Sequence, residues 1–199
     1  MKPENNIPVG GYLRVNLPSD DSLMAVLNSN LNVCTSVTGF TSNIDCEVDS
    51  ITQFRILNGF GSTAFTTDGT ADLSFQMNGI RNPRSFKQTS SFTFTTFDAS
   101  NFEIDSKNAG ITTEMTIVSN LHNAEFATSS EQNAATASYT FTITPRSPLL
   151  ATDVLKVTCP SEVTKPPNPT TCSVGGTAVA AGCSVIGSVV TVPSLQAAN

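Results

Sequence analysis

Apolar and polar residues alternate in short runs along most of this chain. The clearest run covers residues 137–161, where Tyr139, Phe141 and Ile143 fall on one face of a strand and threonines lie between them. Prolines then interrupt the pattern, and it resumes around Val157. The stretch therefore predicts a strand, a turn and a second strand that together form a hairpin.

The rest of the chain predicts further short strands at intervals of about 8–15 residues, separated mainly by glycine, asparagine and aspartate. Helical patterns are scarce, and residues 20–27 are expected to form a loop. This organisation is typical of an all-β fold, and we expect immunoglobulin-like β-sandwich repeats. The other predicted strands cover residues 11–17, 33–36, 44–48, 53–60, 72–80, 90–98, 102–104, 111–119, 124–129 and 188–192.

Part of this pattern occurs twice. Residues 2–19 align with residues 144–161 without a gap, so that Leu13 matches Leu155. The chain is therefore expected to hold about one and a half copies of a repeat of about 140 residues. In the second copy, the strand with Tyr139, Phe141 and Ile143 comes just before the matched segment. The matched segment of the first copy has no such strand before it in this sequence. We therefore expect the first copy to lack its partner strand.

Two units follow from this repeat, with the boundary at the Asn82-Pro83 dipeptide. Residues 1–82 are interpreted as the C-terminal part of one sandwich repeat, and residues 83–199 as a second repeat without its last strand. An incomplete sandwich exposes an unpaired strand edge. Another copy can fill that edge with a strand of its own, and head-to-tail donation that does not close into a ring produces a filament.

Four of the five cysteines form two pairs at similar spacing in the two copies. We expect disulfides Cys34–Cys46 and Cys172–Cys183, each across a short hairpin, and therefore an oxidising compartment. Metal binding is the competing interpretation, but the chain has one histidine and no C-x-x-C motif, whereas zinc takes four nitrogen or sulfur ligands. Cys159 replaces a leucine of the first copy and is expected to be a free, buried cysteine, with an intermolecular disulfide as the alternative.

The composition narrows the class of protein further. Charged residues make up 13% of the chain and serine and threonine are abundant, as in secreted, wall-associated or O-glycosylated β proteins. The net charge of −6 and the scattered lysines and arginines argue against a nucleic-acid partner. No apolar run is long enough to span a membrane. Because no signal peptide precedes these extracellular features, Met1 is not expected to be the natural start.

Candidate chemistry is sparse. Asp98, Glu103 and Asp105 place carboxylates at intervals along one polar stretch, which is a candidate calcium site, with a simple polar turn as the alternative. His122 has no nearby catalytic partner in the sequence and is expected at the surface. Motifs for serine nucleophiles, nucleotide phosphates or dinucleotides are missing, so we do not expect an enzyme.

Three threonines are candidate sites of O-glycosylation. Thr164, Thr170 and Thr171 flank the prolines of the sequence TKPPNPTT, which is expected to be an accessible loop. Unmodified, solvent-facing threonines are the alternative interpretation.

The stretches NPRSFKQTSSFTFTTFDASNFEIDSKNAGITTEMTI and SYTFTITPRSPLLATDVLKVTCPS resemble the tandem β-sandwich repeats of very large cell-surface proteins in ciliates and related protists. NNIPVGGYLRVNLPS, from the first copy, is similar to the recurrent turn and strand of that family. The resemblance covers most of residues 1–20 and 80–162. It implies an extracellular protein that builds a coat, hair or fibre, and it carries no catalytic residues.

We therefore predict a structural subunit of an extracellular or cell-surface filament, a glycoprotein that assembles with copies of itself by β-strand complementation. Deleting residues 2–17 is expected to abolish assembly. The alternative is an adhesin-type binding module that recognises a glycan or a protein and is stabilised by calcium.

Overall fold

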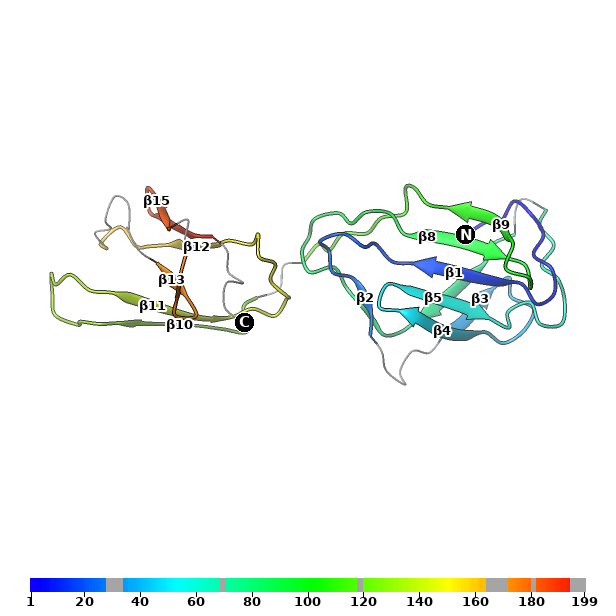
Figure 1. Cartoon of the computed structure of the whole chain (residues 1–199), viewed down its shortest axis with the longest axis horizontal. Coiled ribbons are helices and arrows are strands. Elements are labelled where there is room, and N and C mark those ends of the chain that lie inside the picture. The colour runs from blue at the N-terminus through cyan, green and yellow to red at the C-terminus, as the bar shows by residue number, and fades with distance from the viewer. Residues whose placement is uncertain (28–33, 69–70, 118–119, 164–171, 180–181, 194–199) are drawn as a thin grey trace. The chain divides into compact units, whose positions relative to one another are not determined.

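The computed structural model describes residues 1–27, 34–68, 71–117, 120–163, 172–179 and 182–193. All of the regular secondary structure in these ranges is β-strand, which confirms the predicted all-β class. The strands form several antiparallel sheets within two compact units, Met1–Val118 (unit 1) and Ser119–Asn199 (unit 2) (Figure 1).

Unit 1 contains one five-stranded sheet in the order β4-β5-β1-β8-β9 and two short ribbons, β2-β7 and β3-β6. All of these neighbours pair antiparallel. The strands are β1 (Tyr12–Asn16), β2 (Ala25–Val26), β3 (Cys34–Thr38), β4 (Asp45–Ser50), β5 (Gln53–Leu57), β6 (Ser74–Met77), β7 (Ile80–Arg81), β8 (Thr93–Phe97) and β9 (Glu103–Lys107).

Strand β1 is the central strand of the sheet. Leu13 lies opposite Ile56 of β5 and Thr96 of β8, and Val15 lies opposite Phe54 of β5. Because successive side chains of a strand point to opposite faces, these apolar residues all reach the same face of the sheet. We expected this strand to lack a partner. That expectation is wrong, because β1 is paired along both of its edges.

The core of unit 1 lies between this sheet and the two ribbons. The five-stranded sheet contributes leucine, valine, isoleucine and phenylalanine side chains, and half-buried residues of β6 and β7 pack against them. Burying each of these side chains stabilises the fold by about 1.5–3 kcal/mol relative to leaving it exposed. The buried members of this cluster are Leu13, Val15, Leu17, Met24, Val26, Ile44, Phe54 and Ile56.

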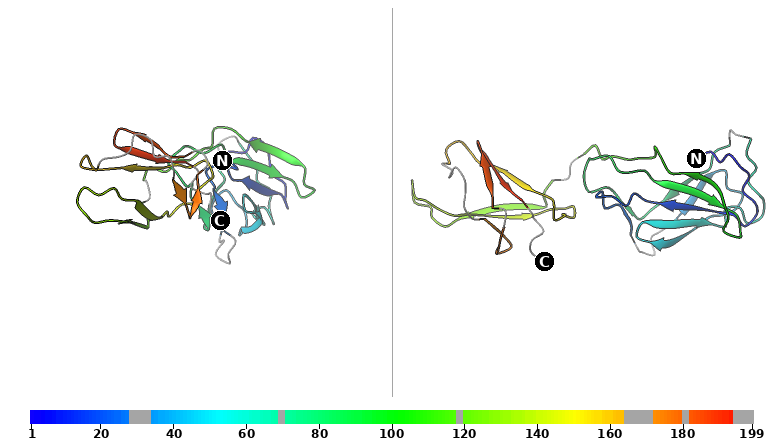
Figure 2. Two further views of the ribbon diagram at one scale, coloured as in Figure 1. Left: turned by 60° about the vertical axis from the view of Figure 1, so that its left-hand side comes forward. Right: turned by 45° about the horizontal axis from the view of Figure 1, so that its top comes forward.

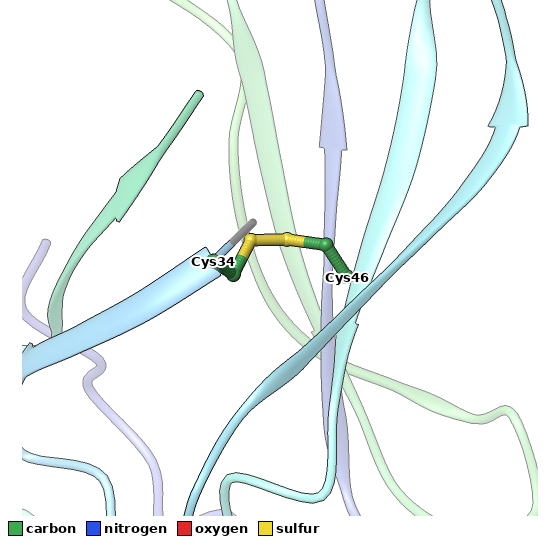
Figure 3. Close-up of a disulfide and its surroundings, with 2 residues drawn as sticks. All are labelled: Cys34 and Cys46. Carbon is green, nitrogen blue, oxygen red and sulfur yellow. A yellow bond between two sulfur atoms is a disulfide. The ribbon is translucent and has the colours of Figure 1, made fainter. Parts of the chain in front are cut away.

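The disulfide Cys34–Cys46 connects two sheets (Figure 3). Cys34 belongs to β3, which pairs with β6, whereas Cys46 belongs to β4, which pairs with β5. The two Cα atoms are 5.6 Å apart, within the usual range for a bridge. The predicted pairing is confirmed, but the expected hairpin between the two cysteines is wrong, because each strand has a different hydrogen-bonded neighbour.

The division between the units lies at Val118, beyond the Asn82-Pro83 dipeptide where we expected it. Strands β8 and β9 follow that dipeptide in the sequence, yet they pair with β1 and with each other in the sheet of unit 1. Residues 83–118 therefore complete the first unit.

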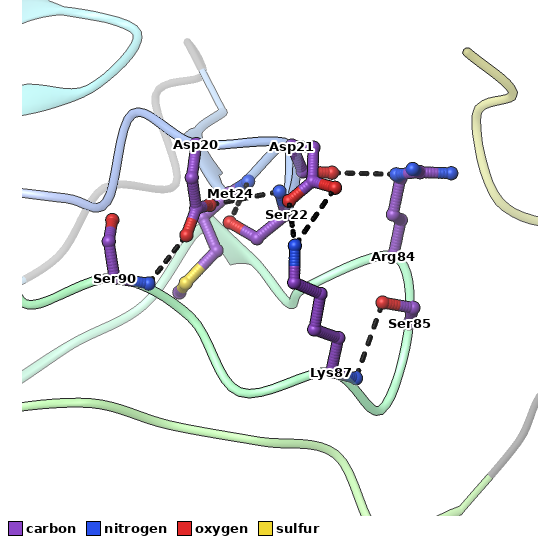
Figure 4. A network of polar contacts seen from close by, with 8 residues as sticks. All are labelled: Asp20, Asp21, Ser22, Met24, Arg84, Ser85, Lys87 and Ser90. Carbon is purple, nitrogen blue, oxygen red and sulfur yellow. Dashed lines mark hydrogen bonds and ion pairs between the residues drawn. The ribbon is translucent and has the colours of Figure 1, made fainter. Parts of the chain in front are cut away.

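A polar network fastens the segment that leads into β8 (Figure 4). The carboxylate of Asp20 accepts a hydrogen bond from the backbone N–H of Ser90. The ammonium of Lys87 lies 3.1 Å from the carboxylate of Asp21, and Nε of Arg84 donates to the Asp21 carbonyl at 2.6 Å. These contacts join the loop after β1 to the segment after β7, so that β8 enters the sheet beside β1.

Unit 2 has smaller sheets: the hairpin β10-β11, the three-stranded sheet β12-β16-β15 and the ribbon β13-β14 (Figure 2). The strands are β10 (Asn123–Thr128), β11 (Tyr139–Thr144), β12 (Leu155–Thr158), β13 (Ser173–Val174), β14 (Thr177–Ala178), β15 (Ser184–Ile186) and β16 (Val189–Val192). Residues 137–161 thus contain both predicted strands, but the expected hairpin is wrong, because β11 pairs with β10 and β12 pairs with β16.

The repeat seen in the sequence has a structural counterpart, because β12 pairs with β16 as β1 pairs with β5. The N–H of Leu17 donates to the carbonyl of Thr52 at 2.8 Å. The matching N–H of Cys159 donates to the carbonyl of Ser188, also at 2.8 Å. The equivalent rows are Leu13–Ile56 with Leu155–Val192, and Val15–Phe54 with Val157–Val190.

The second disulfide, Cys172–Cys183, is also present, with its Cα atoms 5.9 Å apart. Together the two bridges indicate an oxidising environment. Cys159 is free, as expected, but it is only half-buried, whereas its counterpart Leu17 is 4% exposed. The expectation of a buried Cys159 is therefore wrong, because the core that covers Leu17 in unit 1 is not reproduced around β12.

Replacing Phe54 by alanine should lower the free energy of unfolding of unit 1 by about 3–5 kcal/mol, because the ring is 1% exposed and leaves a cavity. The matched control is Phe126→Ala in β10, where the ring is 69% exposed and the change should stay within about 0.5 kcal/mol. Urea denaturation followed by circular dichroism measures both. Equal effects of the two substitutions would contradict this assignment of the core.

Acid should weaken unit 1 through Asp20. Partial burial raises the pKa of this carboxylate, but hydrogen bonds from Ser22 and Ser90 lower it by more, from the usual 3.8 to about 2. A lowered folded-state pKa gives stability that is complete above pH 3.8 and is lost as the pH falls through about 2. Asp20→Asn should therefore cost about 1 kcal/mol at pH 7 and reduce the acid dependence.

Urea titrations at neutral and acid pH test this expectation. The control is Asp21→Asn, because the ion pair of Asp21 with Lys87 is exposed and should contribute less than about 1 kcal/mol. A steeper loss of stability in acid for the Asp20 variant than for the unmodified protein would argue against the role of this carboxylate.

Candidate interaction site on unpaired strands

Unit 2 leaves large apolar side chains in solvent. Among the described residues, the buried hydrophobic side chains all belong to unit 1 with the exception of Val179. By contrast, Phe126 of β10 is 69% exposed, and Tyr139 and Phe141 of β11 are 48% and 45% exposed. Phe126 and Phe141 lie directly opposite each other in the hairpin. These exposed rings are therefore a candidate interaction surface.

The backbone of β11 also has an open edge. In an antiparallel pair, hydrogen-bonded and non-hydrogen-bonded positions alternate. Ser129 donates its N–H to the carbonyl of Ser138 at 3.0 Å, and in the register of the hairpin the alternation then directs Thr140 and Thr142 toward β10. The intervening residues direct their N–H and C=O groups away from β10, where no strand of the described chain pairs with them. These residues are Tyr139, Phe141 and Ile143.

Both edge strands of the five-stranded sheet differ from β11, because they carry charged side chains. Strand β4 carries Asp45, Glu47 and Asp49, and β9 carries Glu103, Asp105 and Lys107. Charged side chains on an edge strand discourage pairing with another chain. Strand β11, with the sequence YTFTIT, has no charge at all. Its edge is therefore open to another strand both in its hydrogen bonding and in its electrostatics.

Two of the three candidate calcium ligands, Asp98 and Asp105, accept hydrogen bonds from amides. The Asp98 carboxylate accepts hydrogen bonds from two backbone N–H groups of the turn that follows it, at 2.8 and 2.9 Å. The Asp105 carboxylate accepts from the side chain of Asn5 at 2.7 Å, and Glu103 lies at the start of β9. No group of three metal-binding side chains occurs in the part of the chain that the structure describes. The polar turn is thus the interpretation that the geometry favours.

The other candidate residues are spread over unit 2. Thr164, Thr170 and Thr171 lie outside the described residues. His122 is exposed and lies just before β10, where its backbone N–H donates to the carbonyl of Thr144 at 2.8 Å. Cys159 follows β12 directly. His122 and Cys159, the described residues of this group, thus lie next to strands of two different sheets.

Phe126 is the residue that sequence reasoning missed as part of the interaction surface. The segment around it was expected to be a strand, and β10 confirms that strand. The sequence NAEFAT shows which face the ring occupies, but it does not show whether another element covers that face. The signal available in the sequence was the uncharged, aromatic pattern of the partner strand β11.

No helix in the described ranges has the length and apolarity to cross a membrane. Comparisons with protein-family models, with curated proteins and with solved structures find no match for this chain.

In dilute, monomeric protein the N–H groups of Tyr139 and Phe141 should exchange with deuterium far faster than those of Leu13 and Val15. The first pair faces an open edge, whereas the second pair lies in the centre of a paired sheet whose opening requires unit 1 to unfold. Hydrogen exchange followed by NMR measures both pairs in one sample. Equal protection would mean that another part of the same chain covers β11.

Proposed function

We propose that this chain is a structural subunit of an extracellular filament and that its copies join head to tail by β-strand complementation. The observation that carries the proposal is the exposed, uncharged edge of β11 together with its exposed aromatic side chains. Such a strand gains backbone hydrogen bonds and apolar burial when it pairs with the sheet of another molecule.

The pairing of the repeat supports the same conclusion. In unit 1, β1 has β5 on one edge and β8 on the other. In unit 2, β12 has β16 on the matching edge, and no described strand occupies the place of β8. We infer that both units are immunoglobulin-like β-sandwiches, that unit 1 has its own core, and that unit 2 is completed by strands from a neighbour.

An open polymer follows from the position of the exposed strand. Strand β11 belongs to unit 2, in which Val179 is the one buried hydrophobic residue among those described. A donor on one unit and an acceptor on another create a heterologous contact, which propagates as a filament unless the rotation closes a ring. The partner of this protein is therefore another copy of itself.

The compartment agrees with this role. Two disulfides are suited to an oxidising space, and an outer surface with few charges and many hydroxyl groups is suited to glycan attachment. We place the filament at the cell surface, with O-linked glycans on its exterior. The alternative, a calcium-stabilised adhesin, draws no support from Asp98 and Asp105, whose carboxylates bind amides.

Deletion of residues 2–17, which the sequence suggested as a test, would not isolate assembly from folding. It removes β1, the central strand of the five-stranded sheet, and with it buried residues such as Leu13 and Val15. A variant without them would lose unit 1 altogether. A useful test must leave the core intact.

Material purified without denaturant should form unbranched fibres in the electron microscope, with an axial repeat about the length of one or two sandwiches. Sedimentation velocity should show polymers that grow with concentration, because head-to-tail association is reversible at the strand edge. Protein with reduced and alkylated cysteines serves as the control for unfolding. Discrete monomers at every concentration would exclude the filament and favour a binding module.

A further inference from the structure

Unit 1 contains two Asn-Gly dipeptides, and the structure holds them differently. Asn58-Gly59 follows β5, whereas Asn78-Gly79 connects β6 to β7. In such a dipeptide the backbone nitrogen of the glycine can attack the side-chain carbonyl carbon of the asparagine, because glycine has no Cβ to shield that nitrogen. The attack requires both residues to move out of their folded conformation, so its rate depends on how firmly each dipeptide is held.

Asn58-Gly59 is held at its side chain and at its backbone. The side-chain Nδ2 of Asn58 donates to the carboxylate of Asp45 at 2.6 Å. The carbonyl of Gly59 accepts a hydrogen bond from the backbone N–H of Thr41 at 2.9 Å. Gly59 is buried, and the ring of Phe40 leaves no room beside it for a Cβ. The rotation that brings the Gly59 nitrogen to the side chain of Asn58 would therefore break several contacts.

Asn78-Gly79 is held at one point. The side chain of Asn78 is exposed, and no hydrogen bond joins its amide to another residue in the described ranges. The backbone N–H of Leu27 donates to the carbonyl of Gly79 at 2.7 Å, a bond that does not engage the Gly79 nitrogen. The φ angle of Gly79 is +82°, which glycine adopts without strain. The side-chain carbonyl carbon of Asn78 is thus free to rotate toward the Gly79 nitrogen.

We propose that Asn78 is a site of spontaneous deamidation, with water as the co-reactant. The Gly79 nitrogen loses its proton and bonds to Cγ of Asn78, and Nδ2 leaves as ammonia. Water then opens the cyclic imide. Cleavage of the new N–Cγ bond gives aspartate, whereas cleavage of the bond between the nitrogen and the original backbone carbonyl carbon gives isoaspartate. This modification is independent of the proposed function.

Isoaspartate lengthens the main chain at a point where both flanking strands are fixed. Its backbone runs through Cβ and Cγ, which inserts one additional carbon atom between β6 and β7. On one side, Met77 lies opposite Cys34, which the disulfide joins to β4. On the other side, Ile80 lies opposite Val26 in a ribbon of two residue pairs. The shorter β2-β7 ribbon is therefore the one that loosens.

The contacts of β7 show what the modification would change. Ile80 packs against the core cluster of unit 1, and the guanidinium of Arg81 donates to the carbonyl of Leu23 at 2.8 and 3.1 Å. The hydrogen bond between Leu27 and Gly79 weakens first, because Gly79 is joined directly to the new linkage. Aspartate keeps the main-chain length and leaves these contacts in place.

Peptide mass spectrometry tests the site. Trypsin cleaves after Arg55 and Arg81, so a single peptide, residues 56–81, contains both Asn58 and Asn78. The folded, disulfide-bonded protein is incubated at mildly alkaline pH, and digestion in heavy-oxygen water marks any conversion that occurs during the digest. Asn78 should deamidate at least about tenfold faster than Asn58, because Asn58 must first break its hydrogen bonds.

The control is the same protein unfolded in urea, with its cysteines reduced and alkylated. Both dipeptides then lack their folded contacts, so the two asparagines should deamidate at rates within about threefold of each other. In the folded protein, equal rates at the two sites or faster conversion of Asn58 would overturn the proposal. Conversion of Asn78 in urea with none in the folded protein would overturn it as well.

Hydrogen exchange measures the effect on the β2-β7 ribbon. In the isoaspartate-containing fraction, isolated by chromatography, the N–H of Leu27 should exchange at least about fivefold faster than in Asn78→Gln protein incubated alongside. Glutamine keeps the amide, but its longer side chain cyclises much more slowly. Asn78→Asp carries the other product with a normal backbone and should protect Leu27 as the unmodified protein does. Unchanged protection of Leu27 in the isoaspartate fraction would overturn the loosening of β7.

Both measurements follow unit 1 in dilute protein, so neither depends on filament formation. Selective conversion of Asn78 with faster exchange at Leu27 supports the site and its effect, whether or not the chain polymerises.

Discussion

The backbone hydrogen bonds along both edges of β1 determine how unit 1 is built. Strand β1 comes early in the sequence, and its partners β5 and β8 come from segments that are distant from it and from each other. Its apolar face then brings Leu13 and Val15 into one cluster with Val26 and Phe75 of the two ribbons. The polar contacts of Asp20 and Asp21 secure the path into β8. Without a central strand, neither the sheet nor the core beneath it would be continuous.

The same requirement explains why unit 2 differs from unit 1. Strand β12 repeats the sequence of β1 and its register with the next strand, but it is paired on one edge in the part of the chain that is described. Cys159 is consequently half-buried where Leu17 is buried, and the rings of β10 and β11 lie in solvent. The protein thus joins a unit with a completed core to a unit whose strands remain available for pairing.

Sequence patterns predicted which face of each strand is buried better than they predicted which strands pair with one another. The period-two alternation located β1, β8, β11 and β12, and the repeat and both disulfides were visible in the sequence. Pairing was not, because the side-chain pattern of a strand specifies which face is buried and leaves open which strand supplies its hydrogen bonds. The expected hairpins at residues 137–161 and Cys34–Cys46 were wrong for this reason. Likewise, the carboxylates near Asp98 suggested calcium because their amide partners are invisible in the sequence.

The position of the Cys34–Cys46 bridge has a mechanical consequence. It fastens β3, the only described strand that pairs with β6, covalently to β4 at the edge of the large sheet. Tension applied to β6 would pass into β3 by shear of their hydrogen bonds, and then through a covalent bond into the sheet. The bridge therefore prevents the β3-β6 ribbon from being peeled away from the sheet at Cys34.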